Sequence, residues 1–201
     1  MVIAYHIVFS AYGFWLPNDP RGSNSDYVRS KDLLPFGEAK KVQHNRSVAH
    51  HPHDWTVRQL AKDALKYKPV RFTGKQARSV GRGFAKAIRK AGLIVVACAI
   101  LPDHVHLVVL RHRYVIETIV RLLKSAATTQ LLADGLHPFA DVKLNDGSRP
   151  SPWGQKYRDV YLFDKAELLR KIRYVVDNPL KERKPCQSWS FVAAYSPDGI
   201  T

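Results

Sequence analysis

The chain has 201 residues, enough for one domain or for one domain with a sizeable insertion. Its 32 Lys and Arg outnumber 17 Asp and Glu, and the resulting formal net charge of +15 favours nucleic acid as the partner. The sequence has no apolar run of ~20 residues and no lipidation motif, so we expect no membrane association. It shows no signal peptide, and its two cysteines have neither zinc-ligand nor disulfide spacing, so we expect a reducing cytoplasmic location.

The first strand is predicted over Val2 to Ser10, and a less regular stretch follows it. Residues 11–68 contain a dense cluster of turn residues and weakly patterned segments. We interpret them as an elaborated insertion with short helices at Glu38–Asn45 and Val57–Tyr67. The insertion also holds a histidine-rich patch whose irregular spacing favours a polar loop over a second metal site: His44, His50, His51 and His53.

Thr73 is a candidate N-cap for an amphipathic helix that runs to Ala91. One face of this helix is apolar, and the other carries only basic side chains. A charge run of this kind is often a solvated face. Because no acidic residue accompanies the stripe, we expect it to contact the phosphates of DNA. The basic residues are Lys75, Arg78, Arg82, Lys86 and Arg89.

The middle of the chain predicts a hairpin followed by a second helix. Leu93 to Ile100 is a continuous apolar run, and His104 to Arg111 returns as its partner strand. Val115 to Ala133 has the apolar spacing of a helix, and a polar loop over Asp134 to Pro152 follows it. The order of strand, helix, two strands and helix is typical of a ferredoxin-like or RRM-like α+β sandwich, in which an antiparallel sheet carries helices on one face.

The last quarter of the chain predicts a third helix. Residues 153–163 are mixed in character and could be extended at 160–162. Asp164, with Glu167 three residues later, resembles a capping box, and the helix should end at Asn178 because Pro179 disfavours further helix. Residues 179–201 then form a C-terminal tail. We expect residues 1–201 to form a single domain that contains the insertion.

Two histidines stand at the start of the second hairpin strand. His104 and His106 are two residues apart, so their imidazoles point to the same side of a strand and can bind one divalent metal ion. The simpler interpretation is a hydrogen-bonded pair at a strand edge. His6, on the first strand, could lie beside His104, although a satisfied core histidine is the simpler assignment.

Tyr174 lies off the apolar stripe of the third helix. It shares the polar face with Asn178, four residues later, and with Arg170 and Lys171, two basic residues that we expect to contact DNA. A phenol can attack a phosphodiester that a metal ion makes electrophilic. Two imidazoles and the amide oxygen of Asn178 suit Mg²⁺ or Mn²⁺ better than a closed zinc site. The simpler interpretation is a surface tyrosine followed by an Asn-Pro helix stop.

These segments resemble a known family. Residues 101–106, Leu-Pro-Asp-His-Val-His, resemble the His-hydrophobic-His motif of the HUH-class single-strand tyrosine transposases. Residues 174–180, Tyr-Val-Val-Asp-Asn-Pro-Leu, resemble the Tyr-x-x-x-Asn-Pro segment of their REP-associated branch. Residues 153–163 and 189–191 also fit that branch, and the resemblance covers the first strand and residues 74–195.

The resemblance implies that Tyr174 is the nucleophile, that His104 and His106 bind the metal, and that Asn178 is a third ligand. It implies breakage of single-stranded DNA to leave a 5′-phosphotyrosine and a free 3′-OH, with recognition of hairpins formed by palindromic repeats. Asp103 stands where the family commonly has Asn, which we expect to change turn chemistry only. Related proteins include dimers with exchanged tyrosine helices as well as monomers, so both a monomer and a homodimer remain open.

Two other functions are compatible with the sequence. One is a non-catalytic nucleic-acid-binding module with an RNA-recognition-like sheet, although no aromatic-rich strand of that kind is evident. The other is a metal-dependent nuclease that uses water as its nucleophile. It would release free DNA ends and leave no covalent link to the protein.

Overall fold

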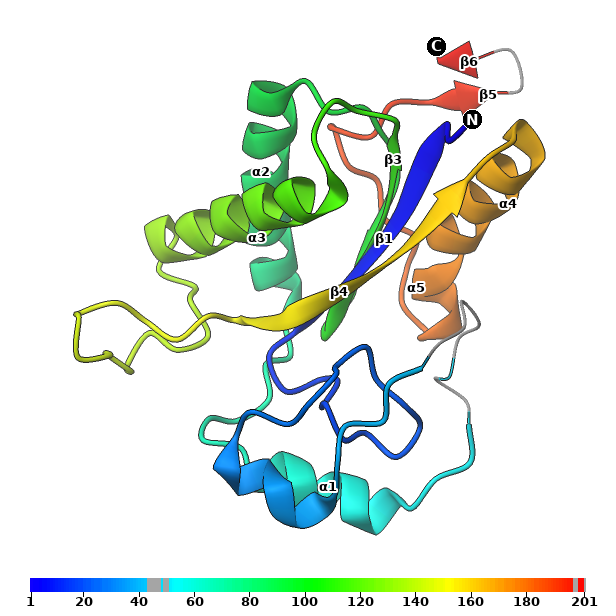
Figure 1. The fold of residues 1–201 in the computed structure, drawn as a ribbon. Helices are drawn as coiled ribbons and strands as arrows, with labels where there is room; N and C mark the ends of the chain where they lie inside the picture. The colour runs from blue at the N-terminus through cyan, green and yellow to red at the C-terminus, as the bar shows by residue number, and fades with distance from the viewer. Residues whose placement is uncertain (43–47, 49–50, 197–198, 201) are drawn as a thin grey trace.

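In the computed structural model, which describes residues 1–42, 48, 51–196 and 199–200, a four-stranded antiparallel sheet forms the centre of the fold (Figure 1). The strand order is β2-β3-β1-β4, so the first strand lies in the interior between the third and the fourth. The strands are β1 (Ala4–Ala11), β2 (Val95–Ile100), β3 (His104–Leu110) and β4 (Trp153–Leu162). The predicted α+β sandwich is confirmed, and β4 is longer than the three residues expected to be extended.

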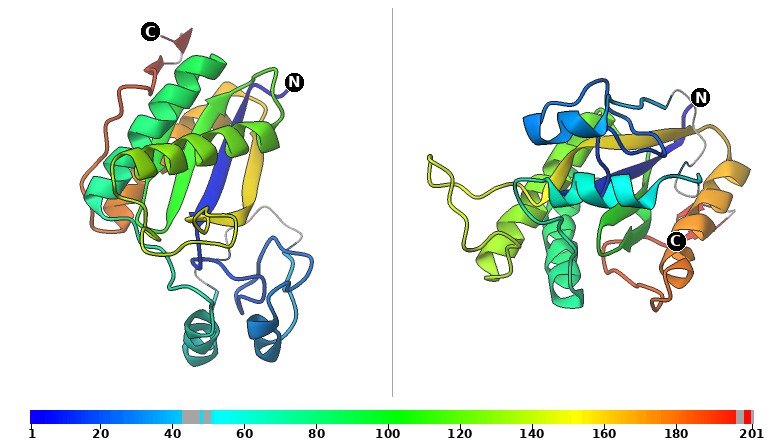
Figure 2. Two further views of the ribbon diagram at one scale, coloured as in Figure 1. Left: turned by 90° about the vertical axis from the view of Figure 1, so that its left-hand side faces the viewer. Right: turned by 90° about the horizontal axis from the view of Figure 1, so that it is seen from below.

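Helices α2 (Gly74–Ala91) and α3 (Ile116–Ala133) cover one face of the sheet (Figures 1 and 2). Thr73 caps α2 with the predicted box, because its side chain accepts from the Gln76 N–H while the Gln76 side chain accepts from the Thr73 N–H. The two helices touch at Gly83, where a Cβ atom would lie 2.6 Å from the carbonyl oxygen of Ala126. This layer contains the main apolar core.

Helix α4 (Lys165–Val176) packs on the other face of the sheet through Leu168 and Val175. The helix was expected to end at Asn178, but it ends two residues earlier, and a short helix α5 (Asn178–Lys181) follows. Pro179 lies in the first turn of α5, where backbone N–H groups have no acceptor within the helix, so the missing proline N–H costs no hydrogen bond. The proline therefore separates two helical segments instead of ending the helix.

The alternation of β1 and β3 decides which residues face which layer. Ile7 and Phe9 point into the core with α2 and α3, as do Val105 and Leu107 on β3. The intervening residues of both strands therefore face α4. His104 and His106, which were predicted to share one side of their strand, therefore lie on the sheet face that α4 partly covers.

The described residues of the insertion that follow β1 lie below one end of the sheet in Figure 1 and hold a small apolar cluster of their own. They include a 3-10 helix η1 (Lys31–Phe36) and helix α1 (Trp55–Asp63), which is the second predicted helix shifted by a few residues. The first predicted helix is wrong for residues 38–42, which are not helical, and its remaining residues, 43–45, lie outside the described part. His44 and His50 also lie outside it.

A buried ion cluster holds this insertion together. Asp19 has no exposed side-chain surface and pairs with Arg21 at 2.8 Å and with Arg58, on α1, at 3.3 Å. The two guanidinium groups lower the pKa of Asp19 against the opposing effect of burial. Loss of either arginine would leave part of that buried charge uncompensated.

The C-terminal segment returns along β2. The Gln187 side chain exchanges two hydrogen bonds of 2.8 Å with the backbone of Ile100, and Val192 bridges to Val95. A two-stranded ribbon, β5 (Tyr195–Ser196) and β6 (Gly199–Ile200), ends the chain. Within the described residues, no helix is long and apolar enough to cross a membrane.

Candidate active site

His104 and His106 lie side by side on β3, on the sheet face that α4 partly covers. Their ring centroids are 4.9 Å apart. His106 is buried and the His104 side chain is 14% exposed. The strand spacing therefore brings both imidazoles to one side of the sheet, as the sequence predicts, with His104 nearer the surface.

Each of these histidines has a partner on its Nδ1 atom. The Asp103 carboxylate lies 2.8 Å from His104 Nδ1, and His6 Nε2 lies 3.0 Å from His106 Nδ1. An ionised carboxylate only accepts, so His104 donates to it from Nδ1, and Nε2 faces away from this hydrogen bond. When His106 donates from Nδ1 to His6, its Nε2 atom is likewise available. Metal-bound histidines in proteins are commonly oriented in this way through the second ring nitrogen.

Burial keeps the inner histidines neutral. Burial lowers the pKa of His6 to about 3, with smaller contributions from Lys171 and Arg158. Burial also lowers the pKa of His106 well below its usual value, helped by His104 and His6. Neutral imidazole is the form that binds a metal ion.

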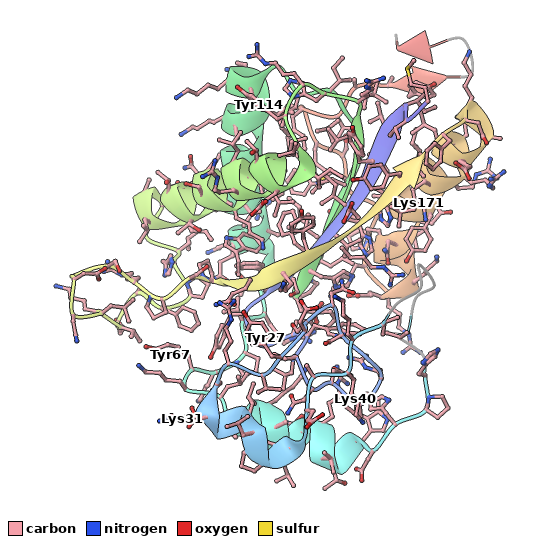
Figure 3. The ribbon with its side chains drawn as sticks, in the orientation of Figure 1. Tyr27, Lys31, Lys40, Tyr67, Tyr114 and Lys171 are labelled. Atoms are coloured by element: carbon pink, nitrogen blue, oxygen red, sulfur yellow. The ribbon has the colours of Figure 1, made fainter. Side chains whose placement is uncertain are left out.

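Tyr174 lies next to the inner histidine pair. Its ring centroid is 5.7 Å from that of His106 and 5.9 Å from that of His6, both in edge-on arrangements. The residue is 37% exposed, so the inner edge of the ring is packed and part of it reaches solvent. The ammonium groups of Lys181 and Lys171 lie 4.3 Å and 5.1 Å from the ring centre. Figure 3 shows Lys171 on α4, beside the sheet.

Oxygen donors for a metal ion are present around His104. Asp103, His104 and Glu182 each offer a donor atom, and these atoms lie within 4.8 Å of one another. Asn178, the predicted third ligand, is buried in the first turn of α5, and its side-chain nitrogen has no partner within the described residues. Because amide nitrogen and oxygen positions are interchangeable assignments, an oxygen could occupy that orphaned position. Mixed nitrogen and oxygen donors of this kind fit Mg²⁺ or Mn²⁺.

Residues of the insertion cover the outer side of His104. The Phe14 ring stacks on the His104 imidazole at 5.1 Å with an interplanar angle of 7°. The Lys62 ammonium lies 5.7 Å from the Phe14 ring centre. On the other side, Arg71 pairs with the second oxygen of Asp103 at 2.9 Å. The insertion therefore contributes directly to the surroundings of the histidine pair.

The basic residues predicted to bind DNA fall on two sides of the molecule. Arg170 and Lys171 lie on α4, and Arg170 lines a pocket of about 350 Å³ together with Tyr174. The α2 stripe lies on the opposite face of the sheet. That stripe is not free of acids, since Arg82 pairs with Asp134 at 2.6 Å. All five of its residues are exposed: Lys75, Arg78, Arg82, Lys86 and Arg89.

Several residues at the site were not assigned to it from the sequence. Asp103 does more than shape a turn, because its carboxylate holds the ring of His104. His6 contacts His106 and not His104, since the register of β1 and β3 pairs His104 with Ser10. His6 stands two residues before Val8, which lies opposite His106, so it is a diagonal neighbour of His106 on the same sheet face. Glu182 had no sequence signal, because its position depends on the turn after α5.

The fold and the site together define an antiparallel α+β sandwich that carries a histidine pair and a tyrosine on one sheet face. The chain is similar in structure to a REP-associated tyrosine transposase bound to a REP hairpin, with 12% identity, a TM-score of 0.45, and coverage of 90% of this chain and 68% of that one. It is also similar to a candidate transposase from Deinococcus radiodurans R1, with 13% identity, a TM-score of 0.42, and coverage of 92% and 94%. Comparison with protein families and with curated proteins finds no match.

Proposed function

We propose that the protein is a metal-dependent enzyme that nicks single-stranded DNA and transfers the strand through a covalent bond to Tyr174. The observation that carries this proposal is the position of the Tyr174 ring, 5.7 Å from that of His106. A phenol beside a neutral imidazole that can hold a metal ion suits attack by tyrosine on a phosphodiester.

The proposed step conserves the energy of the phosphodiester bond. The Tyr174 oxygen attacks phosphorus, a phosphorus–oxygen bond to tyrosine forms, and the bond to the 3′-oxygen breaks. The phenol proton is lost and a proton is gained by the departing 3′-oxygen, which leaves a 5′-phosphotyrosine and a free 3′-OH. Attack by another 3′-OH reverses these changes and joins a new strand. The cycle needs neither water nor ATP.

Each side chain has a defined part in this proposal. His104 and His106 would hold the ion, with Asn178 as the proposed third ligand and Glu182 as a further oxygen donor within reach of His104. When bound, a divalent ion polarises the phosphoryl oxygen and stabilises charge on the leaving oxygen. Lys181 and Lys171 supply positive charge next to Tyr174 and attract the phosphate.

The proposed substrate is a folded single strand, such as a hairpin formed by a palindromic repeat. This part of the proposal follows from the motif resemblance and from the net charge of +15. Arg170 lines the pocket at Tyr174 and is a candidate phosphate contact. The exposed stripe of α2 remains a second candidate surface, for DNA that wraps to the far side of the sheet.

The test is a search for a covalent adduct. The protein is incubated in Mn²⁺ with hairpin DNA labelled at its 3′ end, because a 5′-phosphotyrosine retains the 3′ fragment. The products are separated on a denaturing gel, and the labelled peptide is sequenced. We expect an adduct on Tyr174 that the Tyr174→Phe variant does not form, although the variant still binds the DNA. A His104→Ala/His106→Ala variant should remain folded and form no adduct, because a domain of this size does not need a metal staple.

The same gel separates the alternatives. Free DNA ends without any adduct would support a nuclease that uses water. Binding that is insensitive to chelator and to Tyr174→Phe, with no cleavage, would support a non-catalytic binding module. Adduct formation by Tyr174→Phe at the parent's rate would show that another residue is the nucleophile.

A further inference from the structure

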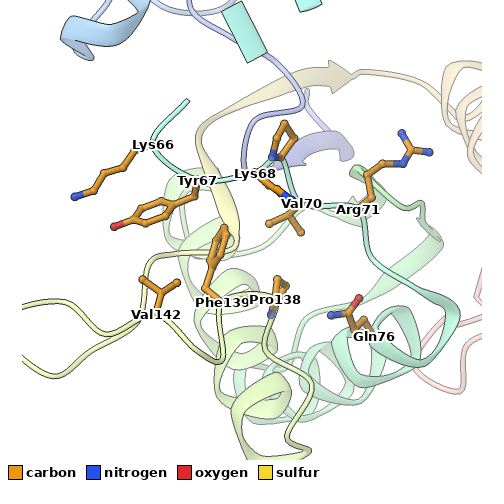
Figure 4. Close-up of a pocket in the computed structure, with 10 residues that line it drawn as sticks. Lys66, Tyr67, Lys68, Val70, Arg71, Gln76, Pro138, Phe139 and Val142 are labelled. Atoms are coloured by element: carbon orange, nitrogen blue, oxygen red, sulfur yellow. The ribbon is translucent and has the colours of Figure 1, made fainter. Parts of the chain in front are cut away.

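A basic pocket that does not include Tyr174 lies between the end of the insertion and the loop after α3 (Figure 4). Its volume is about 520 Å³. One wall is the segment of residues 66–71, and the other is formed by residues 138–142. The residues that carry the following argument are Lys66, Tyr67, Lys68, Arg71 and Phe139.

The first wall is fixed to the end of the sheet by backbone hydrogen bonds. The Val70 N–H donates to the Tyr12 carbonyl at 2.8 Å, and the Phe72 N–H donates to the Pro102 carbonyl at 2.6 Å. The opposite wall is tied to α2, because the Gln76 side chain donates to the Leu136 carbonyl at 2.9 Å. The pocket is therefore built by ordered backbone on both sides.

An aromatic surface lines the pocket. The Tyr67 and Phe139 rings lie close together (Figure 4), with ring centroids 5.4 Å apart, and Phe139 also packs against Tyr12 at 5.8 Å. Phe139 is buried, whereas Tyr67 is only partly buried. The Tyr67 ring is thus supported from behind and keeps some accessible surface. A supported aromatic ring of this kind can stack with a nucleobase.

The charge of the pocket complements a phosphate chain. Lys66 and Lys68 are exposed, and the Lys66 ammonium lies 5.4 Å from the Tyr67 ring centre. The lining residues include no acidic side chain. Two exposed ammonium groups beside an aromatic ring match the repeating unit of single-stranded nucleic acid, which is a phosphate followed by a base.

The pocket is connected to the candidate active site through one ion pair. Arg71 lines the pocket and pairs with Asp103, whose other carboxylate oxygen holds His104. A strand in the pocket would therefore lie next to the residues that orient the outer histidine. A second link is the hydrogen bond from the Phe72 N–H to the carbonyl of Pro102, the residue before Asp103.

We infer that this pocket binds the unpaired nucleotides that flank the hairpin, with a base against Tyr67 and the adjacent phosphates against Lys66 and Lys68. The identity of the ligand as DNA depends on the proposed function. The inference extends that function, because it divides DNA recognition between the hairpin at the tyrosine side and a single-stranded flank at the pocket.

The test compares two ligands under conditions that prevent cleavage. Equilibrium binding to a blunt hairpin, and to the same hairpin with a single-stranded extension, is measured in chelator across a salt series. The parent should bind the extended ligand more tightly. The Lys66→Gln/Lys68→Gln variant should lose roughly tenfold for the extended ligand only, and the slope of log affinity against log salt should fall by about 1.4.

Two further variants complete the design. Tyr67→Leu keeps an apolar side chain but removes the stacking surface, and it should weaken binding of the extended ligand about fivefold or more. Lys31→Gln/Lys90→Gln removes the same charge from exposed positions outside the pocket and should affect both ligands equally and weakly. Excess free deoxynucleotide should not compete at the concentrations where the extension does.

The inference is overturned if the parent binds the extended hairpin no more tightly than the blunt one, or if the lysine variant loses affinity equally for both. It is also overturned if free deoxynucleotide competes for binding as effectively as a single strand. Adduct formation at Tyr174 is scored separately in Mn²⁺. A parent that forms the adduct but ignores the extension would refute the pocket alone. A parent that prefers the extension but forms no adduct would refute the catalytic proposal alone.

Discussion

His104 and His106 differ in what holds their rings. Asp103 holds His104 with a charged acceptor at 2.8 Å, and His6 holds His106 with a neutral imidazole at 3.0 Å. Both contacts use Nδ1 and leave Nε2 for other partners. A ring that is fixed before the ion arrives loses less rotational freedom on binding. In the proposed metal site, the two partners would therefore raise the affinity for the ion by fixing the two rings.

We predict that Asp103→Ala weakens Mn²⁺ binding by roughly ten- to 100-fold, the usual cost of losing such an orienting partner. Asp103→Asn should retain most of the affinity, because its amide oxygen still accepts from His104 Nδ1. The measurement is Mn²⁺ titration by electron paramagnetic resonance. If Asn and Ala are equally damaging, Asp103 is itself a ligand. If neither changes the affinity, it has no role in metal binding.

At the level of single residues, the sequence singles out the histidine pair, Tyr174 and Asn178 as candidates because their spacing on a strand or helix is regular. It does not identify Glu182, whose position depends on the geometry after Pro179. The sequence assigns Asp103 only to a turn, because Asp after Pro commonly favours a turn conformation. Its hydrogen bond to His104 was not predicted. His6 was considered, but its partner depends on the register of two strands.

Lys124 is the clearest example of a side chain that joins two elements. It extends from α3 toward β4, and its ammonium group donates to the Gly154 carbonyl at 2.8 Å beside the Phe9 ring. Burial lowers its pKa to about 8. The hydrogen bond satisfies the group but does not remove the cost of burying its charge.

The free energy of unfolding should depend on pH through Lys124. The native protein releases this proton near pH 8, whereas the unfolded chain holds it to about pH 10.5. Between these values the unfolded state binds more protons, so the free energy of unfolding should rise with pH. Lys124→Met should remove this rise, as measured by urea unfolding across the window. Lys90→Met, at an exposed site on α2, is the control, and parallel curves for parent and Lys124→Met would contradict the prediction.

Elements with a single clear periodicity were predicted well. The bounds of α2 match the prediction, because a cap at Thr73 and a left-handed Gly92 mark its ends. β4 was mostly missed, since its ten residues mix exposed and buried positions and carry few β-branched side chains. The η1 helix was missed because it is short and contains Pro35. Its stability comes from packing in the insertion, which local sequence does not reveal.

At the level of the whole molecule, the candidate site is made by one chain. β3 supplies the histidine pair, and α4 of the same chain supplies Tyr174 at ring distance from His106. Dimers that exchange tyrosine helices would need α4 to leave the apolar contacts it makes through Leu168 and Val175. We propose that residues 1–201 act as one domain, with 11–68 as an insertion and 179–201 as a tail.

We predict that two inactive variants will not rescue each other. Tyr174→Phe keeps the histidines, and His104→Ala/His106→Ala keeps the tyrosine, so a mixture contains every group but never in one chain. With size-tagged proteins, the labelled hairpin should form no adduct in the mixture. An adduct on the histidine variant would show that its Tyr174 attacks DNA together with the histidines of a neighbouring subunit. That result would favour a dimer with exchanged tyrosine helices.

The stacking of Phe14 on His104 has a practical consequence for making a shorter version of this protein. Phe14 follows β1 by only three residues, and Lys62 approaches it from α1. Splicing out the whole of residues 11–68 would therefore strip one wall from the outer imidazole. A shorter version should instead be made by trimming the stretch between η1 and α1, because that change retains both Phe14 and Lys62.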